Sequence, residues 1–144
     1  MEIPGRYLRS GDILFSLTGG DSYQDAWFLP MHVGMYVKWD ADGRDVIEAT
    51  VPTGGCDPPA NGVVMGWYNG DCGFRSLRGQ HIFVGARRPV SRSGAPVTVA
   101  QGESAVETAR DFLGFEYGIV GLANGVGGID CAQLVERGWQ GAGV

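Results

Sequence analysis

The sequence predicts a small α+β protein, in which a β-rich N-terminal half packs against a helical C-terminal half. Short segments of β-forming residues, separated by glycine- and proline-rich turns, occupy the first ninety residues. Apolar residues at helical spacing begin only after the proline-bounded stretch 89–96. A chain of 144 residues can bury one core. We therefore expect a single domain over 1–144, with a β-rich half at 1–90 and a helical half at 97–144.

Five segments of the N-terminal half have the composition of strands. The predicted strands cover residues 13–15, 32–39, 45–50, 62–67 and 80–87. The polar turn at 40–43 ends in Gly43 and predicts a hairpin between the second and third strands. Together the segments predict a small antiparallel sheet or half-barrel that packs against the helices.

Two helices are predicted in the C-terminal half. The first covers residues 99–113 and is ended by Gly114. Its apolar residues recur at helical spacing: Ala105, Val106, Ala109, Phe112 and Leu113. A glycine-rich stretch, 118–128, leads to Asp130, which is a favourable N-cap for a second helix. That helix carries Cys131, Leu134, Val135 and Trp139.

The charge and the apolar pattern exclude two classes of partner. The net charge is -5 and the pI is about 4.8, which argues against a nucleic-acid-binding protein. No segment has the long apolar run of a membrane-spanning helix.

The first residues lack the apolar stretch of a signal peptide. We therefore expect a protein made in the cytosol, which reaches any substrate outside the cell by another route.

The cysteine pattern does not predict a disulfide framework or a metal site. The three cysteines are Cys56, Cys72 and Cys131, an odd number without a CxxC pair. Only His32 and His81 could add imidazole ligands. No metal or organic cofactor is expected. Cys56 and Cys72 lie in predicted loops and are interpreted as incidental thiols, and His81 as a structural strand residue.

Cys131 is the best-placed candidate nucleophile. It occupies the first turn of the second predicted helix, where the helix dipole and free backbone N–H groups stabilise a thiolate. The same N–H groups can stabilise the oxyanion that forms when a thiolate attacks a carbonyl group. Taken by its position alone, this cysteine is more often a packed core residue.

His32 and Glu48 are candidate partners for that thiol. His32 begins a predicted strand and has an ordinary pKa suited to proton transfer. Glu48 lies on the next strand, and a hairpin can bring it beside the imidazole ring, where a carboxylate orients the ring and stabilises imidazolium. Taken singly, His32 is also explained as a strand-end residue and Glu48 as a solvent-facing one. Trp27, Phe28, Trp67 and Tyr68 either line a groove or form edges of the core.

These motifs together resemble a known peptidase family. The C-terminal half contains FLGFEYG…GGIDCAQLVERGW, which resembles the opening of the NlpC/P60 cysteine peptidase domain. The N-terminal half contains GDILFS…HVGMYVKWDADGRDVIEA and VGARRP, which resemble the later barrel half of that domain. The order is reversed, because His32 precedes Cys131. The chain therefore resembles the circularly permuted branch, which includes YiiX-like and lecithin:retinol acyltransferase-like proteins.

The resemblance implies a circularly permuted papain-like fold and hydrolysis of an amide bond, with a bacterial cell-wall peptide as the first candidate substrate. It assigns Cys131 as nucleophile, His32 as base, Glu48 as third member and Tyr117 as an oxyanion or groove residue. Glu48 replaces the histidine that is common in the ordinary family, and residues 132–133 are Ala-Gln in place of Ser-Gly.

Two other functions remain compatible with the sequence. The lecithin:retinol acyltransferase resemblance allows acyl transfer or cleavage of a lipid or thioester with the same residues. That activity predicts a deep apolar channel, whereas a cell-wall peptidase predicts an open polar groove. A non-catalytic binding module on a papain-like fold is the third alternative.

Overall fold

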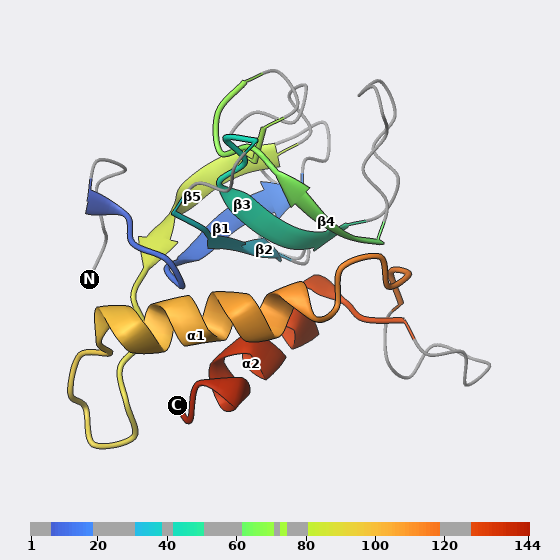
Figure 1. The fold of residues 1–144 in the computed structure, drawn as a ribbon. Helices are drawn as coiled ribbons and strands as arrows, with labels where there is room; N and C mark the ends of the chain where they lie inside the picture. Colours follow the sequence, from blue (N-terminus) through green and yellow to red (C-terminus); the bar gives the residue numbers. More distant parts are fainter. Residues whose placement is uncertain are drawn as a thin grey trace.

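An antiparallel sheet packs against a pair of helices in the computed structural model (Figure 1). The structure describes residues 7–18, 31–38, 42–50, 62–70, 73–74, 81–118 and 128–144. Within these residues the strands are β1 (Ile13–Thr18), β2 (Met31–Tyr36), β3 (Val46–Thr50), β4 (Gly62–Gly66) and β5 (His81–Arg87). Their order in the sheet is β4-β3-β2-β1-β5. The helices are α1 (Val99–Arg110) and α2 (Cys131–Gly141), so the predicted α+β class is confirmed.

The main core lies between the sheet and the helices. Met35, Ile47 and Ala49 point from β2 and β3 into this layer, where they join Ala109 of α1 and Leu134 of α2. Alternate residues of a strand face opposite sides of the sheet. The opposite side therefore carries a second cluster, formed by Leu14, Val46, Tyr68, Phe74 and Ala86.

Glycines let the helices approach each other and the sheet closely. A Cβ atom at Gly138 of α2 would lie 2.8 Å from the carbonyl oxygen of Ala105 and 2.9 Å from Cε of Met35. A Cβ atom at Gly102 of α1 would lie 2.1 Å from the carbonyl oxygen of Ser10. All three distances are shorter than a Cβ atom tolerates, so these two glycines set how closely the helices approach each other and the sheet.

The ends of several elements differ from the sequence prediction. The helix predicted over 99–113 ends at Arg110, because the following N–H groups bond to carbonyls three residues back, as in the pair Phe112–Ala109 at 3.1 Å. Leu113 is consequently 41% exposed instead of facing the core. Gly114 follows with φ 86° and ends the turn as predicted. The strand predicted over 32–39 ends at Tyr36, and β1 is three residues longer than predicted.

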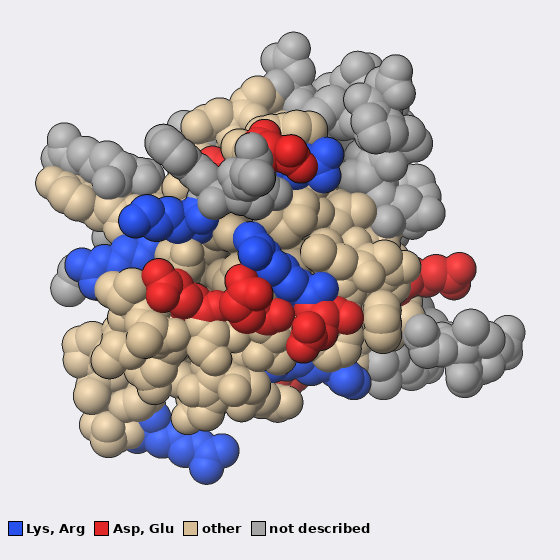
Figure 2. Space-filling view, viewed as in Figure 1, with Lys and Arg blue, Asp and Glu red and all other residues tan. Residues whose placement is uncertain are grey.

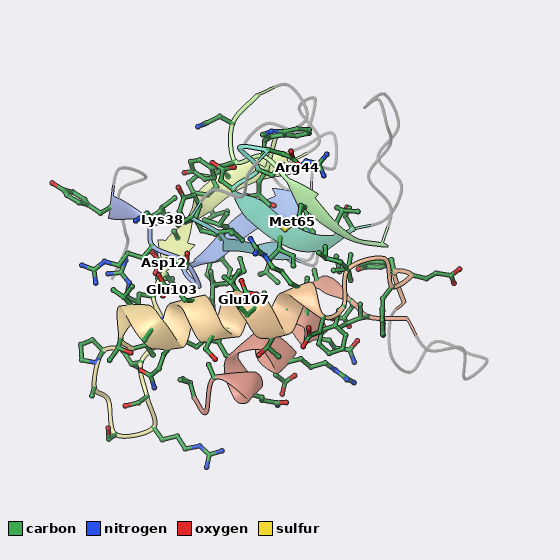
Figure 3. All side chains as sticks on the ribbon, in the orientation of Figure 1. Asp12, Lys38, Arg44, Met65, Glu103 and Glu107 are labelled. Atoms are coloured by element: carbon green, nitrogen blue, oxygen red, sulfur yellow. The ribbon has the colours of Figure 1, made fainter. Side chains whose placement is uncertain are left out.

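One face of the molecule carries a band of acidic side chains. Figure 2 shows this band, and Figure 3 places Glu103 and Glu107 on α1, where both side chains are exposed. Of the helices in the described residues, neither is long and apolar enough to span a membrane.

Candidate active site

β2 and β3 stop pairing with each other before either strand ends, and the site forms where this pairing stops. Their last residue pair is Gly34–Glu48, although β2 begins at Met31 and β3 continues to Thr50. Every second N–H group of a strand faces the same neighbouring strand. The Val37 N–H, just after β2, faces β3, because it donates to the carbonyl oxygen of Asp45 just before β3. The Val33 N–H therefore also faces β3, but it lies beyond the ladder. It donates instead to the sulfur of Cys131.

Cys131 is held by the first turn of α2. The Asp130 carboxylate accepts the Gln133 N–H at 2.7 Å, and the Gln133 side-chain oxygen accepts the Asp130 N–H at 3.0 Å. This reciprocal pair is a capping box, formed with Asp in place of Ser or Thr. Among the described residues, no acceptor bonds the N–H groups of Cys131 and Ala132. Two oriented donors beside the thiol are therefore available for an oxyanion.

A short parallel bridge brings Tyr117 to the same place. The Ile129 N–H donates to Glu116 at 3.0 Å, and the Gly118 N–H donates to Ile129 at 3.3 Å. The chains approach so closely here that a Cβ atom at Gly128 would lie 2.4 Å from Cα of Gly118. Because Ile129 is two residues from Cys131, the bridge places the Tyr117 hydroxyl in hydrogen-bonding contact with the thiol.

His32 and Glu48 form a buried pair on the sheet. Nε2 of His32 lies 2.5 Å from Oε2 of Glu48, and the two residues are 6% and 5% exposed. Glu48 is directly opposite Gly34, so its side chain is a diagonal neighbour of His32. The ring also stacks on Phe74, with centroids 5.3 Å apart. Since Nε2 faces Glu48, the hydrogen bond to Cys131 uses the other ring nitrogen, Nδ1.

These contacts change the protonation of the thiol and the imidazole. Burial alone would lower the pKa of His32, but hydrogen bonds to Cys131 and Glu48, with their negative charges, raise it to about 9. Burial opposes ionisation of Cys131, yet the hydrogen bonds from His32 and the Val33 N–H lower its pKa below the ordinary value. Both shifts favour a thiolate–imidazolium pair over a pair of neutral groups.

Tyr117 is held in its protonated form. Burial raises the pKa of its hydroxyl, and the charges of Cys131 and Asp130 raise it further. The hydroxyl therefore acts as a donor towards the sulfur, or towards an oxyanion formed beside it.

The structure thus brings together all four residues that the sequence proposed for the site: Cys131, His32, Glu48 and Tyr117. Cys56, Cys72, Trp27 and Phe28 lie outside the described residues, and His81 is the first residue of β5. Tyr68 is buried in the second cluster, whereas Trp67 is exposed beneath the Arg44 guanidinium, 5.3 Å from its ring centroid.

Sequence reasoning missed two contributors to the site. The Val33 N–H carries no sequence signal, since any residue except proline supplies one. Phe74 precedes a stretch without strand periodicity, and only the fold places it under the His32 ring. In the described part of the chain, no three His, Cys, Asp or Glu side chains gather as metal ligands.

Comparisons of this chain with protein-family models, with curated proteins and with solved structures find no match.

Proposed function

We propose that this protein is a cysteine hydrolase that cleaves an amide bond, with Cys131 as nucleophile and His32 as proton shuttle. The observation that carries the proposal is the continuous chain of contacts Tyr117–Cys131–His32–Glu48. A structural cysteine needs only apolar neighbours, whereas this one has an imidazole, a hydroxyl and a backbone donor.

In the first step the Cys131 thiolate attacks the carbonyl carbon, and the electron pair of the C=O bond moves to oxygen. The N–H groups of Cys131 and Ala132, with the Tyr117 hydroxyl, are placed to stabilise the oxyanion. The His32 imidazolium then donates its Nδ1 proton to the leaving nitrogen. The C–N bond breaks, the amine departs and a thioester remains on Cys131.

In the second step neutral His32 takes a proton from water, and the hydroxide attacks the thioester. Collapse of the second oxyanion expels the Cys131 thiolate and releases a carboxylic acid. Glu48 keeps the ring oriented and stabilises the imidazolium in both steps, as a triad carboxylate does.

The order of the elements supports a circularly permuted papain-like arrangement. The histidine strand β2 and the glutamate strand β3 precede the cysteine helix α2 along the chain, as the NlpC/P60 resemblance implies. By this resemblance a bacterial cell-wall peptide is the first substrate class to test.

A small cavity lies on the same sheet as His32 and Glu48, over β1 and β5. In the described part of the chain, Phe15, Val84, Gly85 and Arg87 line a space of about 170 Å³ that opens to solvent. A closed cavity of about 150 Å³ holds a single benzene. The space therefore fits one side chain of a peptide substrate.

Alkylation by iodoacetamide, resolved by mass spectrometry, tests the activated thiol without a known substrate. We expect Cys131 to react at neutral pH faster than Cys56 and Cys72, and to keep its reactivity at pH values where an ordinary thiol is protonated. His32→Ala should slow alkylation of Cys131 at neutral pH roughly tenfold, because the pKa of the thiol rises when the hydrogen bond and charge of its imidazolium partner are removed.

His81→Ala is the matched control, since it removes the other histidine of the chain. Slow, equal labelling of all three cysteines would support a non-catalytic binding module instead. An acyl adduct on Cys131 after incubation with cell-wall peptide fragments would identify the substrate class directly, and Cys131→Ala should form none.

A further inference from the structure

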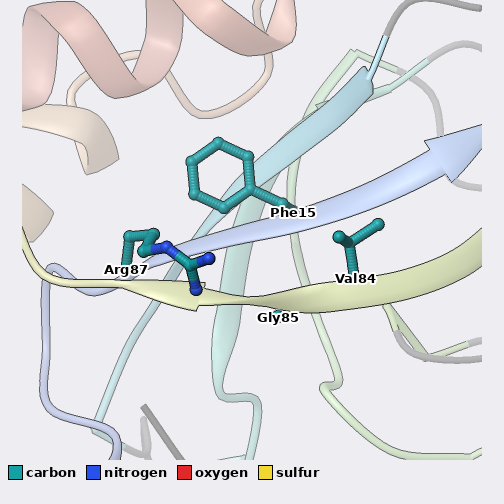
Figure 4. A pocket seen from close by; sticks show the side chains of 4 residues that line it. All are labelled: Phe15, Val84, Gly85 and Arg87. Carbon is teal, nitrogen blue, oxygen red and sulfur yellow. The ribbon is translucent and has the colours of Figure 1, made fainter. Parts of the chain in front are cut away.

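A small pocket lies on the helix-facing side of the sheet, over β1 and β5. Phe15 of β1 is on the same side as Ile13, which packs against the main core. Among the described residues, the helices contact mainly β2 and β3, so they leave the β1–β5 side of this face less covered. Figure 4 shows Phe15 and Val84 projecting from neighbouring strands to the same side, with the Arg87 side chain extending along β5 towards Phe15.

A β-bulge shapes this pocket. Phe15 is opposite Gly85 and Ser16 is opposite Phe83, so Val84 is an extra residue without a partner on β1. The bulge turns Val84 outwards, where it is 46% exposed. Gly85 has φ 149° and no side chain, which leaves the floor of the pocket open.

The pocket is within reach of a molecule bound at Cys131. Phe15 is directly opposite Val33, whose N–H bonds the thiol. Neighbouring strands are about 4.8 Å apart, so Gly85 lies about 10 Å from Val33 across two strand spacings. An extended peptide advances about 3.3 Å per residue, and two to three residues therefore separate the reacting carbonyl from the pocket.

The pocket combines an apolar surface with the positively charged guanidinium group of Arg87. The Arg87 guanidinium donates to the carbonyl oxygen of Ala86 at 3.1 Å, and no carboxylate of the described residues pairs with it. The next residue differs, because Arg88 is fully engaged with Asp12. A ligand with an apolar group next to a carboxylate complements both features.

We propose that this pocket is a specificity subsite for the C-terminal residue of a short peptide, holding an apolar side chain against Phe15 and Val84 and its free carboxylate at Arg87. The inference rests on the proposed hydrolase, and it adds that the scissile bond lies two to three residues before a free C-terminus. The protein would accordingly release dipeptides and tripeptides from the C-terminal ends of peptides.

Thiol-directed probes test the subsite separately from catalysis. The probes are bromoacetyl-glycyl-leucine, its C-terminal amide, and bromoacetyl-glycyl-glycine; in each, the Cys131 thiolate forms an S–CH₂ bond and bromide leaves. Alkylation rates at Cys131 are divided by the iodoacetamide rate of the same protein. We expect the leucine acid to react about fivefold faster than its amide, as for an exposed ion pair, and several-fold faster than the glycine acid.

Variants at exposed positions assign the preference to the pocket. Arg87→Gln should remove most of the acid-over-amide preference, and Arg87→Glu should favour the amide. Val84→Ser should reduce the leucine-over-glycine preference. Arg92→Gln, which removes an exposed arginine outside the pocket, should change neither ratio.

The results of these alkylation measurements distinguish the subsite from the proposed hydrolase. Loss of the acid preference in Arg87→Gln but not in Arg92→Gln supports the subsite. Equal rates for the acid and the amide in the wild type overturn the subsite. A preference for the acid that survives Arg87→Gln also overturns it, because the attraction then comes from the His32 imidazolium. Fast iodoacetamide labelling with no probe preference defeats the subsite alone, whereas an unreactive Cys131 defeats the proposed hydrolase.

Discussion

At the residue scale, the protonation state of the site depends on whether burial or the two hydrogen-bonding partners act more strongly on His32. Burial disfavours imidazolium, but the thiol and Glu48 outweigh burial and raise the pKa to about 9. The folded protein thus binds this proton more tightly than the unfolded chain does. Its contribution to stability is complete below pH 6.5 and is lost as the pH rises through about 9.

Replacing Glu48 tests this balance directly. Glu48→Gln is nearly isosteric, and it removes the negative charge that stabilises imidazolium. We expect the pKa of His32 to fall from about 9 towards 6.5, and the pKa of Cys131 to rise because its partner loses charge. The alkaline limit of activity should move to lower pH in the same direction. NMR titration of the His32 ring measures the first shift and the pH dependence of alkylation the second.

Glu107→Gln is the control, because that carboxylate is exposed on α1, away from the candidate site, and pairs with Arg110. The second histidine, His81, serves as an internal reference in the titration. Unchanged titration of His32 in Glu48→Gln would remove Glu48 from the site and leave Cys131 and His32 as a dyad.

At the element scale, the first turn of α2 combines two opposed effects. The Asp130 carboxylate stabilises the helix by accepting the Gln133 N–H. Its negative charge, however, raises the pKa of Cys131. Stability of the element and reactivity of the thiol therefore respond differently to changes at the same residue.

Two substitutions at Asp130 separate these effects. Asp130→Asn retains a capping oxygen and should leave stability nearly unchanged, while the pKa of Cys131 falls further. Asp130→Ala removes the cap as well and should destabilise the protein by about 1 kcal/mol. Urea unfolding measures the stability, and the pH dependence of alkylation measures the thiol. Equal destabilisation by both substitutions would contradict the capping role.

The bridge between Tyr117 and Ile129 is the second element that positions the site. Gly128→Ala would place a methyl group 2.4 Å from Gly118, so the bridge must open and move Tyr117 away from the thiol. We expect slower alkylation of Cys131 together with a lower unfolding midpoint, because Ile129 of the bridge is buried in the main core. Gly143→Ala is the control for a strained glycine substitution away from the bridge, since Gly143 has φ 75° and its added Cβ meets no atom within 4 Å. Normal reactivity in Gly128→Ala would show that the bridge does not position the thiol.

At the scale of the whole molecule, one ion pair joins the two ends of the β-rich half. Arg88 follows β5 and donates to both oxygens of Asp12, at 2.8 and 2.7 Å, just before β1. Figure 3 places Asp12 at the end of the sheet above α1. The Asp12 side chain is 1% exposed and that of Arg88 26%, so the pair is largely removed from water. It ties the end of β5, which lines the pocket, to the segment just before β1.

Breaking this pair should be costly. Asp12→Asn leaves a largely buried guanidinium without its counter-charge and should destabilise the protein by about 2–4 kcal/mol. Arg110→Gln breaks an ion pair whose Glu107 side chain is 70% exposed, and should change stability by about 0.5 kcal/mol or less. Thermal or urea unfolding compares the two. Similar small effects would show that the Asp12 pair does not hold the sheet together.

The sequence alone determined the elements that local patterns encode. The α+β class, the Asp130 cap and the positions of the strands follow from periodicity and capping chemistry, which act over a few residues. Helix and strand ends were less predictable. The apolar pattern continues to Leu113, but the hydrogen bonding changes after Arg110, and periodicity does not register that change.

The tertiary structure decided what depends on contacts between distant segments. The sequence proposed Cys131, His32, Glu48 and Tyr117 through motifs, but it contains no signal for the parting of β2 and β3 that frees the Val33 N–H for the thiol. It likewise gave no separate role to Arg87 and Arg88, adjacent residues of one basic cluster. Arg88 lies against the Asp12 carboxylate and Arg87 along an open pocket, because neighbouring residues of an extended chain point in opposite directions.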